Sequence, residues 1–142
     1  MEEIYGLSLR KVVGDDGVRL PPPSFSKAIE ISDSKKIKVI GIDMDEESFT
    51  DSYTSNVSTW QLYKKGRLEN KMAKKGIEGV TPQEIVLNME KAIREITGFA
   101  KLEEERLQTM TDNIKSNLDK PKILVIVELS NADFLIKTLK ES

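Results

Sequence analysis

The residues from Thr81 onward carry the strongest local structure signal in the chain. Thr81, Pro82 and Glu84 combine an N-cap threonine with proline at the first helical position and glutamate at the third. The threonine oxygen can accept a free backbone N–H of the first turn, and the glutamate can accept the N–H of the cap residue. This combination predicts a helix that begins at residue 82.

Apolar residues recur at helical spacing from this start as far as Leu118. The pattern fits one helix of about 36 residues, roughly 54 Å long at 1.5 Å per residue. It fits equally well two packed helices that break at Thr97-Gly98. A single interior glycine costs only ~1 kcal/mol, so Gly98 does not decide between the two arrangements.

The chain before this helix shows β-like patterns. Residues 25–32 and 36–43 predict two strands joined by a polar turn. Residues 44–58 are polar and predict a loop. Residues 59–63 and 67–72 predict a second hairpin, which turns at Lys64-Lys65-Gly66.

Two further segments follow the helical region. The unbroken apolar run 123–127 is rich in β-formers and predicts a strand buried on both faces. Residues 132–140 fit either a short helix or the return strand of a hairpin. Strands, then helices, then a buried strand predict an α+β fold: a mostly antiparallel sheet of about four to five strands packed against a long helix or a helical hairpin.

The 142 residues fit a single domain. Residues 1–23 are predicted to form an N-terminal arm, with a hairpin or extended stretch over 4–20 and a stiff spacer at Pro21-Pro22-Pro23. Residues 24–142 would form the α+β core. No apolar run approaches the ~20 residues needed to span a bilayer, and the acidic N-terminus does not resemble a secretory signal. These features predict a cytoplasmic protein that does not bind membranes.

The absence of two residue types restricts the chemistry. The chain has no histidine and no cysteine. This excludes serine triads, cysteine nucleophiles, disulfides and the usual zinc or iron sites. Catalysis would have to use carboxylates, Lys, Arg or Tyr, with or without Mg²⁺. We therefore expect a protein that is not an enzyme and needs no cofactor.

A basic and aromatic stretch gives the leading functional hypothesis. Between Trp60 and Lys75 the only acid is Glu69, against six basic residues. Single-stranded nucleic-acid sites need cations that follow phosphates and aromatic rings on which bases stack. The predicted binding residues are Tyr53, Trp60, Tyr63, Lys64, Lys65, Arg67, Lys71 and Lys74. The alternative is that the apolar residues of the hairpin belong to the core and the lysines form a solvated rim.

An acidic pair gives the competing hypothesis. Asp43 follows the apolar run 39–42, and Glu128 follows the run 123–127. Carboxylates at the ends of neighbouring strands can hold Mg²⁺ for phosphodiester hydrolysis. The sequence Ile40-Gly41-Ile42-Asp43 resembles the first strand of ribonuclease H-like nucleases, and that resemblance implies Asp43 and Glu128 as metal ligands. The alternatives are a solvated acidic loop or, for the whole chain, a protein-interaction domain that acts through its helices.

A second resemblance concerns the stretch from Tyr53 to Leu68, the capped helix and residues 125–129. Together these look like the archaeal single-stranded DNA-binding family called ThermoDBP. The resemblance implies a sheet packed on helices with a basic, partly hydrophobic cleft that takes bases. It favours DNA over RNA as the ligand, and it leaves open a homodimer or higher homo-oligomer.

Overall fold

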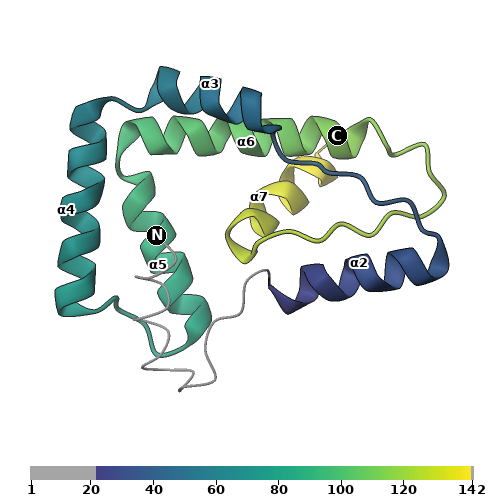
Figure 1. Cartoon of the computed structure of the whole chain (residues 1–142), viewed down its shortest axis with the longest axis horizontal. Helices are drawn as coiled ribbons and strands as arrows, with labels where there is room; N and C mark the ends of the chain where they lie inside the picture. Colours follow the sequence, from purple (N-terminus) through teal and green to yellow (C-terminus); the bar gives the residue numbers. More distant parts are fainter. Residues whose placement is uncertain (1–21, 142) are drawn as a thin grey trace.

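The computed structural model describes residues 22–141 and contains six helices in that range, with no strand among them. The helices are α2 (Pro23–Lys35), α3 (Glu46–Asn56), α4 (Thr59–Lys75), α5 (Pro82–Arg94), α6 (Thr97–Lys115) and α7 (Leu129–Lys140). Helix α6 is the centre of the arrangement, because α3, α5 and α7 all pack against it (Figure 1). Helix α4 lies at one edge of the molecule and α2 towards the other (Figure 1).

Three consecutive helices begin at side chains that cap free backbone N–H groups. The Asp45 side chain accepts from the N–H of Ser48 at the start of α3. Helices α4 and α5 begin with complete capping boxes at Ser58 and Thr81. The predicted start of α5 at Thr81 is therefore confirmed, and the same chemistry fixes the two helices before it.

Two apolar clusters form the core on either side of the middle of α6. The first joins α4, α5 and the N-terminal half of α6, and its buried members are Val57, Met72, Met89, Ile93, Phe99 and Leu102. The second joins the C-terminal half of α6 to α7, and its buried members are Leu107, Met110, Ile114 and Leu135. Together the clusters fix the positions of α3, α4, α5 and α7 around α6.

The predicted α+β fold is wrong, because the described residues contain helices and no sheet. Residues 25–32 lie in α2, the expected loop 44–58 contains α3, and the expected hairpin over 59–72 is the single helix α4. The hairpin prediction gave too much weight to Gly66. The capping box at Ser58 and the Lys, Arg, Leu, Glu, Met and Ala residues of α4 favour a helix that tolerates one interior glycine.

Two segments predicted as strands keep no regular structure. Residues 37–42 and 122–128 run as stretched-out connections between helices (Figure 1). The run 123–127 was expected to be buried on both faces, yet Leu124 is 83% exposed and Val39 of the other segment is 60% exposed. Without a sheet around them, these β-forming residues lose the partners that would have buried them.

Two open alternatives are resolved by the structure. The helical region consists of two helices, since α5 ends at Arg94 and α6 begins at Thr97. The C-terminal residues form the helix α7 rather than a return strand. The predicted hairpin or arm over residues 4–20 lies outside the described residues.

Candidate nucleic-acid interface

The outward face of α4 carries most of the predicted binding residues. Successive steps of three or four residues place side chains on one face of a helix. The exposed residues at this spacing are Trp60, Tyr63, Lys64, Arg67, Lys71 and Lys74, which we call the outer face of α4. The adjoining face holds the half-buried Leu68 and the buried Met72, which anchor α4 to the first core cluster.

The two aromatic rings of the outer face stack on each other in solvent. The ring centroids of Trp60 and Tyr63 lie 5.3 Å apart, with 23° between the ring planes. The two residues are 62% and 53% exposed. Lys64 Nζ lies 5.9 Å from the Trp60 centroid, and Arg67 Cζ lies 6.0 Å from the Tyr63 centroid. A cationic side chain therefore lies near each ring, and the ring pair stays accessible to a flat ligand.

The outer face is positively charged. No ion pair within residues 22–141 involves its four cations, Lys64, Arg67, Lys71 and Lys74. The only acid between Trp60 and Lys75 is Glu69. Its carboxylate is held by Lys65 at 2.6 Å on the inward side of the helix. The four cations therefore act without a compensating carboxylate on the same helix.

Two predicted residues lie away from this face. The Lys65 side chain is only 14% exposed, because it pairs with Glu69 and its Nζ lies 5.5 Å from the Phe99 ring centroid. Tyr53 is half-buried in α3 and meets the Phe99 ring edge-on at 6.1 Å. A two-residue strand period had grouped Trp60 with Leu62, whereas the helical period groups it with Tyr63 and Lys64. The interface is thus a convex helix face and not a cleft.

The two carboxylates of the nuclease hypothesis do approach a common point, although no sheet brings them there. Arg106 Nε donates to Asp43 Oδ1 at 3.2 Å, and Arg106 Nη2 donates to Asp43 Oδ2. Arg106 Nη1 also donates to Glu103 Oε2 at 3.1 Å. These hydrogen bonds and the charges of Glu103, Asp43 and Glu128 raise the pKa of Arg106 above its ordinary value. Partial burial raises the pKa of Glu128, while the charge of Arg106 acts in the opposite direction.

This arrangement gives no support to a metal site. An arginine occupies both oxygens of Asp43, and the part of the chain that the structure describes holds no group of three or more carboxylates that could bind a metal ion. The nuclease hypothesis stays a prediction, which cleavage assays with Mg²⁺ or Mn²⁺ and the variant Asp43→Asn would test.

The sequence reading missed the arginine partners in this region. Arg94 Nη2 donates to Glu103 Oε1 at 3.2 Å and to Asn131 Oδ1 at 3.4 Å. Asn131 is 1% exposed, and its Nδ2 and Arg94 Nε are buried without a hydrogen-bond partner among the described residues. The only available signal was the spacing of Glu103 and Arg106, which three residues separate on one helix.

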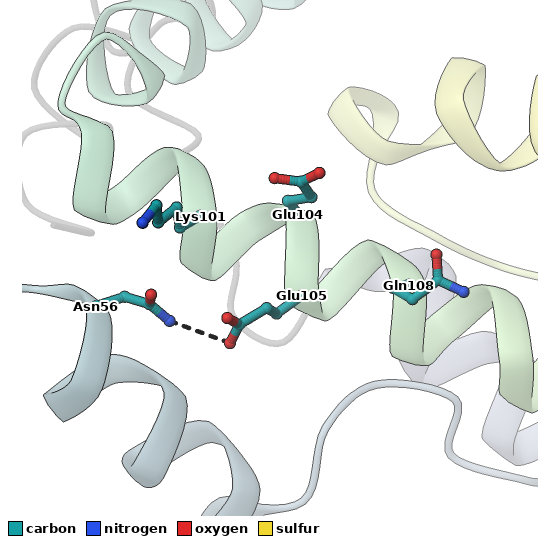
Figure 2. Close-up of a pocket in the computed structure, with 5 residues that line it drawn as sticks. All are labelled: Asn56, Lys101, Glu104, Glu105 and Gln108. Atoms are coloured by element: carbon teal, nitrogen blue, oxygen red, sulfur yellow. Dashed lines mark hydrogen bonds between the residues drawn. The ribbon is translucent and has the colours of Figure 1, made fainter.

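A shallow hollow between α3 and α6 has the opposite character from α4 (Figure 2). Glu105 turns towards Asn56, whose Nδ2 donates to its carboxylate at 3.1 Å (Figure 2). The Ser52 hydroxyl donates to the same oxygen, and these hydrogen bonds lower the pKa of Glu105. Two carboxylates, Glu104 and Glu105, line the hollow with one lysine, Lys101. This charge balance disfavours phosphate binding there.

Comparison with known proteins adds no relative: no family model, no curated protein and no solved structure matches the chain. The resemblances to ThermoDBP and to ribonuclease H-like nucleases therefore stay predictions from the residues quoted for them, and the sheet that both imply is absent from residues 22–141. None of the helices in this range is both long enough and apolar enough to cross a membrane.

Proposed function

We propose that the chain binds single-stranded nucleic acid along the outer face of α4 and that it does so without catalysis. The observation that carries the proposal is that aromatic rings and cationic side chains lie next to one another on one exposed face. A stacked Trp60–Tyr63 pair lies at the N-terminal end of α4, and cations without ion pairs continue from it to Lys74. Base stacking and phosphate contact need these two kinds of group side by side.

The length of the face suits a short stretch of nucleic acid. Fourteen residues separate Trp60 from Lys74, which corresponds to about 21 Å at 1.5 Å per residue. Four cations over this distance can neutralise up to four phosphates. Each phosphate contact on a single strand contributes about −0.7 to the slope of log K against log salt, so we expect a slope of about −2.8.

The aromatic pair favours single strands over duplexes. Bases in a duplex present only their edges to the protein, whereas unpaired bases offer their faces for stacking. Loss of one stacking ring costs ~1–3 kcal/mol, so Trp60→Ala should weaken binding by about 5- to 150-fold. The change should leave the salt slope almost unaltered, because Trp60 carries no charge. The ThermoDBP resemblance favours DNA over RNA as the ligand.

The test is a titration of labelled single-stranded DNA at several salt concentrations, with duplex DNA and single-stranded RNA as competitors. Trp60 is the only tryptophan of the chain, so its emission reports stacking directly. The double variant K71A/K74A should lower the salt slope by about 1.4, two phosphate contacts at about 0.7 each. The matched control K137A/K140A removes two exposed lysines of α7 at the same three-residue spacing and should leave the slope unchanged.

A second control separates the outer face from the inward side of the same helix. The variant K65Q/E69Q removes the ion pair between Lys65 and Glu69 and keeps the net charge of α4. Binding and slope should match the unmodified protein. If K71A/K74A and K137A/K140A reduce affinity equally, α4 is not the binding face; if binding is absent at low salt, the proposed function is wrong. A cytoplasmic location, where such ligands occur, is part of the same proposal and fits a chain without cysteine.

A further inference from the structure

The segment from Lys122 to Glu128 (the 122–128 segment) is an exposed apolar stretch outside the helices, as is the segment 37–42. No described residue forms a backbone–backbone hydrogen bond with residues 122–127. Leu124 is 83% exposed, Ile123 39% and Val125 37%. β-branched and aliphatic residues with unpaired N–H and C=O groups form a template for another strand. The backbone of the segment is therefore free to pair with another extended chain.

The apolar residues of this segment differ in exposure: Leu124 is the most exposed, and Ile126 and Val127 are half-buried. Ile123 and Val125 are the less exposed residues on one side of Leu124 and the other, and Val127 packs against the second core cluster. Leu124 points to solvent between them. The C-terminal part of the segment thus lies against the protein body, while the backbone N–H and C=O groups of residues 122–127 stay without a backbone partner among the described residues.

The sequence of this segment is complementary to itself when reversed. In an antiparallel pair of two copies centred on Val125, Val125 faces its own equivalent, Leu124 faces Ile126 and Ile123 faces Val127. The outer positions then place Lys122 of each copy opposite Glu128 of the other. Opposite charges directly across a strand pair are stabilising, and like charges there are destabilising. Neither residue forms an ion pair with another described residue.

We propose that the 122–128 segment pairs antiparallel with the same segment of a second copy of this chain, in the register that centres on Val125. The resulting two-stranded ribbon has a twofold axis at Val125. It satisfies the open backbone edge and covers part of Leu124 with Ile126 of the other copy. The contact is small, so the dimer is weak and depends on protein concentration.

The other exposed segment of the same chain, residues 37–42, fits this role less well. Both segments end near Arg106, which Asp43 contacts directly and whose charge acts on Glu128. Both run from the right of the view towards its middle in Figure 1, so they run in the same direction, and a parallel pairing would place Glu128 beside Asp43. That arrangement places two negative charges side by side. Pairing with a second copy instead places Lys122 of that copy opposite Glu128.

Single cysteines test the register cleanly, because the chain has none of its own. Val125→Cys places two thiols directly opposite each other across the axis, where the Cα atoms lie close enough for a disulfide. Leu124→Cys places its thiol diagonally from its equivalent, too far for an unstrained disulfide. Leu124 is the more exposed residue, so exposure alone predicts faster cross-linking of L124C than of V125C. Oxidised glutathione should link V125C into a dimer about tenfold faster than L124C.

Charge reversal tests the partner. Each of the variants K122E and E128K alone should sediment as a monomer at concentrations where the unmodified chain dimerises. Each variant places like charges at residue 122 of one copy and residue 128 of the other. An equimolar mixture of the two variants should recover the dimer, because every cross-strand pair is then one acid and one base. Circular dichroism of each variant confirms that the helices remain.

Three outcomes would overturn the proposal. One is faster cross-linking of L124C than of V125C, which indicates collision through exposed thiols. Another is an unmodified chain that stays monomeric at all concentrations. Dimerisation that survives K122E and E128K separately would also contradict this register and assign the interface to another surface.

Discussion

Gly66 provides a test, because a helix and a hairpin at this position predict opposite changes in stability when the glycine is replaced by alanine. In the structure it lies inside α4, and nothing lies within 4 Å of a Cβ added there. Replacement of an interior helical glycine by alanine reduces the entropy of the unfolded chain and improves helix propensity by ~1 kcal/mol. Gly66→Ala should therefore stabilise the protein by about 1 kcal/mol, or about 2–4 °C in Tm for a domain of this size.

A hairpin that turned at Lys64-Lys65-Gly66 would give the opposite result, since glycine in such a turn adopts backbone angles that alanine avoids. The matched substitution is Gly98→Ala. A Cβ at Gly98 would overlap the backbone oxygen of Asn56 and the side-chain oxygen of Gln61. Overpacking of this kind costs ~1–3 kcal/mol, so G98A should destabilise the protein.

Urea unfolding followed by circular dichroism at 222 nm measures both variants against the unmodified chain. The reasoning requires a higher urea midpoint for G66A and a lower one for G98A, with the same m-value. A lower midpoint for G66A would refute the helical assignment of α4, and with it the grouping of Trp60, Tyr63 and the cations on one face. An unchanged G98A would contradict the close packing of α6 on the junction between α3 and α4.

Three further predictions concern capping, pH and the arginine cluster. Thr81→Ala removes the cap that accepts from the N–H of Glu84 and should cost ~1 kcal/mol in urea unfolding. Burial raises the pKa of Glu128 above its ordinary value of 4.5, so the folded state holds this proton more tightly than the unfolded state. Its contribution to stability is present below the unfolded pKa and is lost as pH rises through the folded pKa. Glu128→Gln should therefore lose less stability than the unmodified chain between pH 4 and pH 7 in thermal unfolding; an equal loss would contradict the assignment. Arg106→Leu removes the guanidinium that donates to Asp43 and to Glu103, while the N–H of Met44 still donates to Asp43. It should destabilise the protein by about 1 kcal/mol, and an unchanged Tm would contradict a stabilising role for this cluster.

Local capping chemistry was the part of the fold that the sequence predicted well. Thr81, Pro82 and Glu84 determine the start of α5 through contacts within four residues, so no knowledge of the tertiary structure is needed. The same signal was present at Ser58 and Gln61 and was overlooked because Gly66 suggested a turn. The capping box at Ser58 is enough to predict a helix start at residue 59, and the helical period then places Trp60, Tyr63 and Lys64 on one face.

The strand predicted at residues 123–127 was wrong for a different reason. Residues 123–127 have high strand propensity, but a strand forms only where a neighbouring chain accepts its backbone hydrogen bonds. Propensity says nothing about whether that neighbour is available. The arginine cluster was missed because it depends on tertiary contacts: Asp43 and Arg106 are 63 residues apart in the chain, and no local spacing relates them.

The position of α4 at the edge of the molecule has a consequence for its motion. Met72 is its only buried residue within the described structure, whereas seven residues of α6 are buried. Amide protons of α4 should therefore exchange with solvent through local opening well before those of α6. A ligand that spans the outer face would close this opening, and protection of the α4 amides would rise with ligand concentration while that of α6 stays constant.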